Sequence, residues 1–215
     1  MPIKNAIAQH FKQKYFSSKC IAVILAVLIM GLALAFLFRI DLGTDPCSCM
    51  NRGLSSLLHI SFGNCQLLFN AILFCIIIYF DHSQIGVGTL ANMILVGYSA
   101  DFFGYILDLW IPQSFWQPMS HKILVLLPAL FVFILSAAFY MAVELGTAPY
   151  DATGFVISTH CKKIPFRIIR MIWDLAAMAI GIITGGSFGI VTLLMAFTLG
   201  PAISRVQGIV KQIWS

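Results

Sequence analysis

A chain of 215 residues that is 60% hydrophobic and only 10% charged, with a mean hydropathy of +0.94, cannot cover itself with a wetted surface. A soluble domain of this size needs a polar shell and has about 25% charged residues, so this composition predicts a protein of the lipid bilayer. The net charge of +5 does not indicate a nucleic-acid partner, because the sequence shows no basic patch interleaved with aromatic residues.

The chain begins with a basic segment, residues 1–20, which contains four lysines and precedes the apolar run Ile21–Phe38. A signal peptide starts in a similar way, but its apolar run is about 7–15 residues long and ends at a small-x-small cleavage site. This run is longer and is followed by Arg39. We therefore expect a retained first helix whose N-terminus lies in the cytoplasm.

Six apolar stretches follow one another along the chain, each near the roughly 20 helical residues that cross a hydrocarbon core of about 30 Å. They are Ile21–Phe38, Cys65–Phe80, Ile85–Leu107, Ile123–Val143, Ile168–Thr184 and Phe188–Ile203. Helices are expected, because unpaired backbone groups cannot face lipid and the alternation of a membrane barrel is missing. Lys and Arg gather in 1–20 (four), 162–170 (four) and the tail (two), which places both termini in the cytoplasm.

An internal repeat divides the chain, because residues 29–101 align without gaps with residues 132–204 at a constant offset of 103. Glycine, threonine and proline anchor both copies, and such anchors are typical of turns that end one helix and start the next. The matched turn residues are Gly43, Thr44, Pro46 and Gly86 in the first copy and Gly146, Thr147, Pro149 and Gly189 in the second. The sequence thus predicts two membrane repeats, 21–110 and 123–206, with an outer connector at 111–122 and a cytoplasmic tail at 207–215.

Each copy also contains a short helix directly after the Gly-Thr-x-Pro turn, predicted over Pro46–Phe62 and Pro149–His160. The first carries an arginine and the second is too short to cross, so we expect re-entrant or interfacial helices. Three crossings per copy is an odd number, which predicts an all-α membrane protein of about six transmembrane helices arranged as two inverted repeats. If the short helices did cross, the chain would have eight spans and parallel repeats, and charge counting does not separate the two topologies.

The turn motifs carry a family likeness. The segments Asp41-Leu42-Gly43-Thr44-Asp45-Pro46 and Leu145-Gly146-Thr147-Ala148-Pro149-Tyr150-Asp151 resemble the YczE-like bacterial membrane proteins of the YczE/YyaS/YitT group. The likeness extends from Ile21 to about Arg205 and departs at Cys47-Ser48-Cys49, where an aromatic residue followed by Asp is expected. It implies an integral protein of the bacterial cytoplasmic membrane and supplies no substrate.

Polar side chains inside apolar spans are the first candidates for a site, because burying them costs free energy. Asp174 lies well inside the fifth run, where its alternative role is an i, i+4 ion pair with Arg170. Asn70 and Asn92 are candidates for solute binding, with hydrogen bonds between helices as the alternative. Asp101 lies near the outer end of its span, where it is expected to reach headgroups and water.

The two turns supply a second set of candidates. Inverted-repeat carriers place broken helices near the bilayer midplane, where helix ends and free backbone groups meet the solute. On this basis Thr44 and Asp45 of the first turn, and Thr147, Tyr150 and Asp151 of the second, are candidate solute-binding residues. The alternative is architectural, with Asp45 or Thr147 capping the short helix and binding nothing.

The predicted function is a secondary transporter or channel-like carrier of a small polar or charged solute. The alternative is a non-transporting membrane partner: a regulatory or assembly subunit, or the substrate-binding component of a multi-subunit uptake system, with a protein partner or a second copy. No zinc-protease motif or nucleophile elbow appears, so no enzyme is expected, and no cofactor or metal site is predicted. Cys47 and Cys49 lack the usual metal-ligand spacing, which leaves a redox or soft-metal role open. Trp110, Trp116 and Trp214 are expected to be interfacial anchors.

Overall fold

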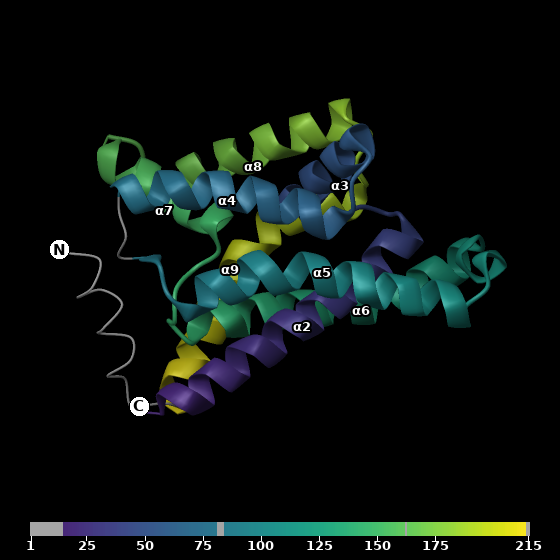
Figure 1. Cartoon of the computed structure of the whole chain (residues 1–215), viewed down its shortest axis with the longest axis horizontal. Helices are drawn as coiled ribbons and strands as arrows, with labels where there is room; N and C mark the ends of the chain where they lie inside the picture. Colours follow the sequence, from purple (N-terminus) through teal and green to yellow (C-terminus); the bar gives the residue numbers. More distant parts are fainter. Residues whose placement is uncertain (1–14, 81–83, 162, 214–215) are drawn as a thin grey trace.

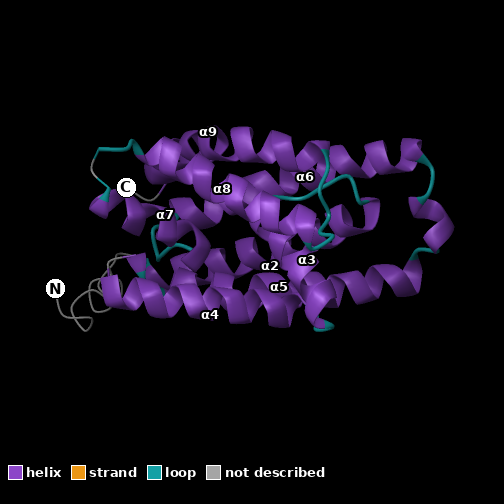
Figure 2. Ribbon diagram, turned by 90° about the horizontal axis from the view of Figure 1, so that it is seen from above, coloured by secondary structure: helices purple, strands orange, loops and turns teal. Residues whose placement is uncertain are grey.

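A computed structural model describes residues 15–80, 84–161 and 163–213, and within these residues the chain is helical without a strand (Figures 1 and 2). Eight α-helices and one short 3-10 helix follow in order. They are α2 (Phe16–Ile40), α3 (Pro46–Leu58), α4 (Phe62–Phe80), α5 (Val87–Trp110), η2 (Gln113–Trp116), α6 (Met119–Ala142), α7 (Pro149–His160), α8 (Phe166–Ile183) and α9 (Ile190–Ile213). The all-α prediction is confirmed for this part of the chain.

Four helices among the described residues are long and apolar enough to cross a membrane, namely α2, α4, α5 and α6. They indicate a multi-pass membrane protein. The other two helices expected to cross differ from these: α8 carries Arg167, Arg170 and Asp174, and the apolar part of α9 covers Ile190–Pro201. Crossing by α8 and α9 stays a prediction.

The helices form two layers along the long axis of the molecule (Figure 1). In the first layer α2 packs against α5 and α6, and α6 packs against α9, around buried side chains such as Val27, Leu34 and Leu37. In the second layer α3 packs on α8, and α4 packs on α7. Each layer thus takes two helices from each copy of the repeat, and the copies interlock across both layers.

The repeat is visible in the backbone of the two turns. Asp41 and Glu144 both have positive φ, 50° and 58°, and Gly43 and Gly146 follow with φ of 107° and 105°. Only glycine adopts the latter angles without strain, so the predicted role of Gly43 and Gly146 is confirmed. Proline then opens the short helix in both copies, as Pro46 and Pro149.

Each turn docks on the other copy. A Cβ at Gly43 would lie 2.6 Å from Oγ1 of Thr192, and a Cβ at Gly146 would lie 2.5 Å from Oγ1 of Thr89. Backbone hydrogen bonds repeat the same exchange, from Val191 N–H to the Leu42 carbonyl (3.3 Å) and from Gly88 N–H to the Leu145 carbonyl (2.8 Å).

These contacts obey the offset of 103, so each contact that one copy makes with the other is returned at the equivalent position. The sequence predicted the matching residues but not that each turn is completed by the other copy.

The short helices lie at opposite ends of the molecule (Figure 1). α3 follows the end of α2 and precedes the start of α4, whereas α7 lies beside the loop that leads into α8. With 13 and 12 residues they are about 20 Å long or less, shorter than a hydrocarbon core of about 30 Å.

One prediction about the connector between the copies was wrong. Trp116 is buried, with 4% of its surface exposed, and its ring packs edge-on against Phe36 at 6.3 Å, so it is not an interfacial anchor. Trp110 at the end of α5 is exposed as expected, and Trp214 lies outside the described residues.

Candidate functional site

A cavity of about 580 Å³ lies between the two layers and is lined by both copies of the repeat; we call it the central cavity. Most of the solute-binding candidates chosen from the sequence line it. They are Asp45, Asn70, Asn92, Tyr150, Asp151 and Asp174. These residues come from the α2–α3 turn and from α4, α5, α7 and α8, so the fold brings together residues up to 129 positions apart (174 minus 45).

The two threonines of the candidate set do not line this cavity. Thr44 is buried in the turn, where its N–H donates to Oγ1 of Thr192 at 3.2 Å. Thr147 donates its N–H to the Gln84 carbonyl at 3.1 Å and its hydroxyl to Oε1 of the same residue at 3.4 Å. Both threonines therefore hold the docked turns instead of facing a solute.

The N-terminus of α3 faces the central cavity through Pro46, Cys47 and Ser48. Asp45 is its N-cap in extended conformation, and Oδ2 accepts the N–H of Ser48 at 3.0 Å. The predicted capping role of Asp45 is confirmed, but it uses only one carboxylate oxygen. The other, Oδ1, is buried and has no hydrogen-bond partner among the described residues.

The N-terminus of α7 also faces the cavity, through Ala148, Tyr150 and Asp151. Its N-cap is Ala148, which offers no side-chain cap, so the alternative in which Thr147 caps this helix was wrong. The carboxylate near this helix end is Asp151, in the first turn.

A cluster of charged and hydroxyl groups joins α7 to α8 on the cavity wall. Arg170 contacts Asp151 through Nη1 at 2.6 Å and Asp174 through Nε at 3.1 Å. Tyr150 donates its hydroxyl to the other oxygen of Asp174 at 2.7 Å, and the Arg170 guanidinium lies 5.2 Å from the centre of the Tyr150 ring. The predicted i, i+4 ion pair is confirmed, and the structure adds two residues of α7 to it.

Two amide side chains of α4 lie on another part of the wall. Asn70 donates its Nδ2 to the backbone carbonyl of Gln66 at 3.0 Å, a bond within one helix instead of the expected bond between helices. Its Oδ1, and Oε1 of Gln66, are buried without a hydrogen-bond partner in the described part of the chain. Sequence reasoning missed Gln66, although a polar residue one turn before Asn70 in the same apolar run is the same kind of signal.

The remaining wall is apolar, and the cavity reaches the surface at one side. Met30, Val96, Phe133 and Met195 of the first layer form its floor. Exposed residues at its edge belong to the start of α8 and the middle of α9. They are Phe166, Arg167, Met171, Phe197, Gly200 and Pro201. The mouth therefore lies towards the end of the molecule that holds the α7–α8 loop.

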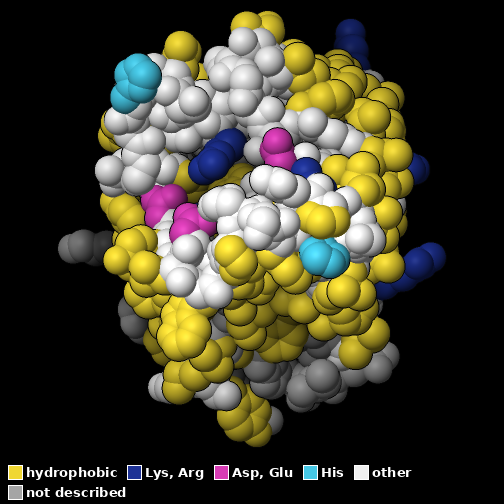
Figure 3. Space-filling view, turned by 90° about the vertical axis from the view of Figure 1, so that its right-hand side faces the viewer, with side chains coloured by type: hydrophobic (Ala, Val, Ile, Leu, Met, Phe, Trp, Pro, Cys, Tyr) yellow, Lys and Arg dark blue, Asp and Glu magenta, His cyan; other side chains and the backbone are white. Residues whose placement is uncertain are grey.

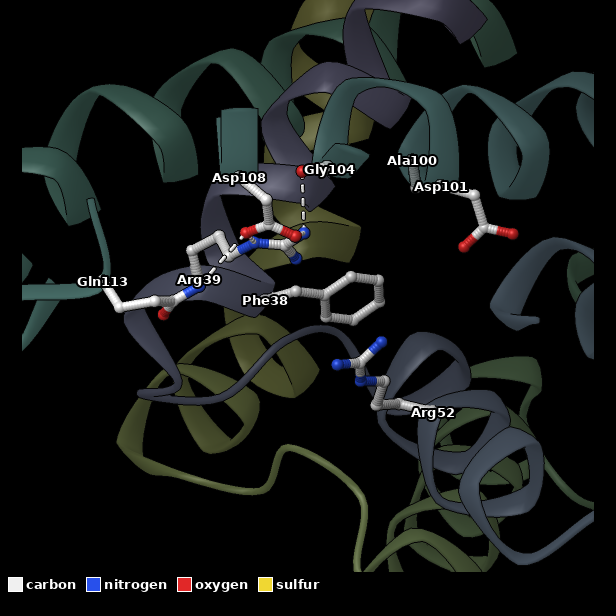
Figure 4. A pocket seen from close by; sticks show the side chains of 8 residues that line it. All are labelled: Phe38, Arg39, Arg52, Ala100, Asp101, Gly104, Asp108 and Gln113. Atoms are coloured by element: carbon white, nitrogen blue, oxygen red, sulfur yellow. Dashed lines mark hydrogen bonds and ion pairs between the residues drawn. The ribbon is translucent and has the colours of Figure 1, made fainter. Parts of the chain in front are cut away.

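A second hollow of about 390 Å³ lies at the opposite end, where α2 and α5 end (Figures 3 and 4). Arg39 donates through Nε to Asp108 at 2.7 Å and through Nη2 to the Gly104 carbonyl at 2.7 Å. Arg52 lies over the Phe38 ring, 4.9 Å from its centre. Figure 3 shows charged side chains around this hollow and hydrophobic side chains on the flanks.

Asp101 also lines the second hollow, but its carboxylate is engaged. Oδ2 accepts the N–H of Gly63 at 2.8 Å, at the first turn of α4. The expectation that Asp101 simply reaches headgroups and water was therefore wrong, because it serves the backbone of a neighbouring helix start.

The paired cysteines of the first copy lie in different surroundings. Cys47 lines the central cavity, and its Sγ accepts a hydrogen bond from Asn51 at 3.4 Å. Cys49 is buried against Gly181 of α8. Both are free thiols, and no group of three or more His, Cys, Asp or Glu with metal-binding geometry occurs in the described residues.

Fold and cavity together define a helical, multi-pass membrane protein with an internal repeat. Residues 17–208 match a family described as a family of unknown function, DUF6198, and the chain belongs to this family. A Haemophilus influenzae protein described as uncharacterized is 21% identical over 201 residues, which cover 91% of this chain and 86% of that protein. No solved structure matches the chain.

Proposed function

We propose that the chain is a membrane carrier of a small polar or charged solute, with the central cavity as its solute site. The observation that carries this proposal is the position of the cavity. It lies where the two copies meet, and both short helices point their N-termini into it. Carriers built from inverted repeats hold their solutes at such a junction of broken helices near the midplane.

The proposed topology has six crossing helices and two inverted copies. The placement of α3 and α7 at opposite ends supports it (Figure 1). Each short helix stands between one crossing helix and the next, and both of those helices meet it at the same end, so the short helix is re-entrant. Lys163, Arg167 and Arg170 lie at the α7 end, which the positive-inside rule assigns to the cytoplasm. The resemblance to YczE-like proteins adds the bacterial cytoplasmic membrane as the location.

The structure corresponds in this proposal to an inward-facing state. The mouth of the central cavity lies at the α7 end, and the hollow at the α3 end is a separate one. Alternating access requires the reverse arrangement as well, in which the α7 end closes and the α3 end opens. The reciprocal contacts between the copies support two such related states.

The direct test reconstitutes the purified chain into liposomes and records uptake of small amines, amino acids, carboxylates and inorganic ions, by radiotracer or by charge movement on a supported membrane. We expect saturable uptake of one class, and loss of that uptake in Asp174→Asn and Asp151→Asn. Unchanged uptake in both variants would remove these carboxylates from the mechanism. Folded chain that moves no solute under any imposed gradient would contradict the carrier and favour the non-transporting membrane partner.

A topology test needs no solute. In a chain whose cysteines are replaced by alanine, a single cysteine is introduced at Ser114 or at Lys163, which are both exposed. A membrane-impermeant maleimide added to intact cells should label the first and not the second. Labelling of both positions from outside would exclude the proposed orientation.

A further inference from the structure

We infer that the central cavity binds a small organic cation that carries N–H donors, such as a primary ammonium or guanidinium group, with Asp45 as its counter-charge. The inference rests on the proposed function only in taking this cavity as the solute site. It names the charge and the hydrogen-bonding character of the solute, which the proposal leaves open.

The first argument is a set of unpaired acceptors. Asp45 Oδ1, Gln66 Oε1 and Asn70 Oδ1 are all buried and all lack a hydrogen-bond partner among the described residues. The exposed fractions of these side chains are 8%, 5% and 1%. The buried hydroxyl of Tyr140, on the same cavity wall, also has no hydrogen-bond partner among the described residues and can donate or accept. A buried acceptor left unpaired costs about 1–3 kcal/mol, so three of them lining one cavity indicate a ligand that brings donors.

The orientation of the Asn70 amide supports this reading. Its Nδ2 is used by the backbone carbonyl of Gln66, one turn earlier in α4. If the Asn70 amide were flipped, that bond would be lost and Oδ1 would face the Gln66 carbonyl oxygen, which is unfavourable. Oδ1 is therefore the atom of this amide that has no partner. The cavity therefore offers an acceptor here and not a donor.

The second argument is charge. Three carboxylates line the cavity, Asp45, Asp151 and Asp174, against the guanidinium groups of Arg167 and Arg170. Arg170 is already shared between Asp151 and Asp174, and Arg167 is exposed at the mouth. Asp45 makes no ion pair within the described part of the chain. A buried carboxylate without a cation is costly, and a bound cation removes that cost.

The helix N-termini do not reverse this preference. Each carries about half a positive charge, which by itself would favour an anion. Asp45 caps α3, and Asp151 lies in the first turn of α7, so a full negative charge already faces each half-charge. An added anion would meet two carboxylates before it met either helix end.

The groups that line the cavity favour an organic cation over a bare metal ion. Hard metal ions are held by about six to eight oxygen ligands, and no group of three or more acidic, His or Cys ligands is assembled in the described residues. The apolar floor of Met30, Val96, Phe133 and Met195 instead provides contacts for carbon atoms. A primary ammonium has three N–H donors, enough for the carboxylate and the two amide oxygens, which are three of the four unpaired oxygens on the cavity wall.

The test is binding to the purified chain in detergent, measured by calorimetry and by the midpoint of thermal unfolding. The probes are n-butylammonium, benzylammonium and methylguanidinium, with butyrate and inorganic phosphate as anions and tetramethylammonium as a cation without N–H donors. We expect the first three to bind and to raise the unfolding midpoint, and the anions and tetramethylammonium to bind more weakly by about tenfold or more. Binding of butyrate or phosphate in preference to the amines, or no binding of any amine, would overturn the inference.

Variants locate the binding. Asp45→Asn keeps an N-cap of similar strength but removes the charge, and it should weaken amine binding by about tenfold or more. Gln66→Leu removes an acceptor and leaves the N-cap of α3 unchanged, and it should also weaken amine binding. Asp101→Asn is the matched control, because Asp101 likewise serves the N–H of a helix start but faces the other hollow; it should bind within about twofold of the parent chain. Parent-like amine binding in both Asp45→Asn and Gln66→Leu would place the cation elsewhere.

The outcomes of the binding test and of the liposome test are independent of each other. Amine binding in detergent without flux of any solute would keep the inference and contradict the carrier. Uptake of an anion together with no amine binding would do the reverse.

Discussion

The two short helices occupy equivalent places in the repeat but are attached by different means. We call their attachments the α3 junction and the α7 junction. At the α3 junction, Gly181 of α8 and Gly186 of the α8–α9 loop lie directly against Cys49. A Cβ at Gly181 would lie 2.7 Å from the Cys49 sulfur, and one at Gly186 would overlap the Cys49 carbonyl oxygen. Gly53 meets Thr184 in the same way.

At the α7 junction the equivalent contacts are between side chains. Ala152 stands where α3 has Cys49, and Val156 stands where it has Gly53; both pack with Ile77 and Ile78 of α4. Isoleucine at 78 takes the place of Gly181, so the backbones cannot approach as closely. The α7 junction also has an ion pair, between Arg170 of α8 and Asp151 of α7. Glycine contacts thus hold α3, whereas larger side chains and an ion pair hold α7.

The largest loss of stability is expected at the ion pairs that hold α7 on α8. Arg170→Met would leave Asp151 and Asp174 without their cation, and breaking a mostly buried pair in this way costs about 3–5 kcal/mol. The measurement is reversible unfolding in mixed micelles, followed by tryptophan fluorescence. Arg167→Met is the matched control: this residue is exposed on the same helix, and its replacement should change the free energy of unfolding by at most about 0.5 kcal/mol. Equal effects of the two variants would mean that the cluster does not hold α7.

A somewhat smaller effect is expected at the glycine contact of α3. Gly186→Ala adds a methyl group where the Cys49 carbonyl lies, and overpacking against rigid backbone should cost about 3 kcal/mol. Gly154→Ala on α7 is the comparison: its Cβ would lie 3.6 Å from the Phe166 ring, an ordinary contact, and the loss of a helix glycine should stabilise by up to about 1 kcal/mol. Unfolding in the same micelles distinguishes the two, and a tolerated Gly186→Ala would refute the close approach at the α3 junction.

The smallest loss of stability is expected at the turn contacts, which both ends of the molecule have in common. Thr89 accepts the N–H of Gly86 at 3.1 Å, and Thr192 accepts those of Thr44 and Gly189 at 3.2 and 3.3 Å. Thr89→Val and Thr192→Val keep the shape and remove these acceptors, so each should cost about 1–2 kcal/mol. We expect the two losses to agree within about 0.5 kcal/mol. A clear inequality would show that the turns do not contribute equally to joining the copies.

The local features were accessible from the sequence. Gly43 and Gly146 were predicted at turns because glycine tolerates positive φ, and Pro46 and Pro149 were predicted at helix starts because proline pre-sets that angle. The apolar runs located the helices to within five residues at every end but one, because only helices satisfy their own backbone in lipid. The exception is α9, which continues to Ile213, ten residues past the end of its apolar run at Ile203. These predictions depend on one segment at a time.

Three failures involve a partner from elsewhere in the chain. Thr147 was expected to bind solute, with capping of the short helix as the alternative, but it bonds to Gln84. Asp101 was expected to be solvated but serves Gly63 on α4. Trp116 was expected at the interface but is buried against Phe36. No spacing within a segment reveals such partners, since each depends on how helices pack.

By itself, the sequence determined that this protein is helical, belongs in a membrane and consists of two related copies, because apolar length, glycine and proline act locally. Only the tertiary structure decided that each turn is completed by the other copy, that Asp45, Gln66 and Asn70 line one cavity, and that the two ends close differently. The reason is that burial, unpaired acceptors and close backbone approach are properties of contacts between distant segments. A repeat that matches in its turns can therefore still differ at its junctions, with glycines at one junction and larger side chains at the other.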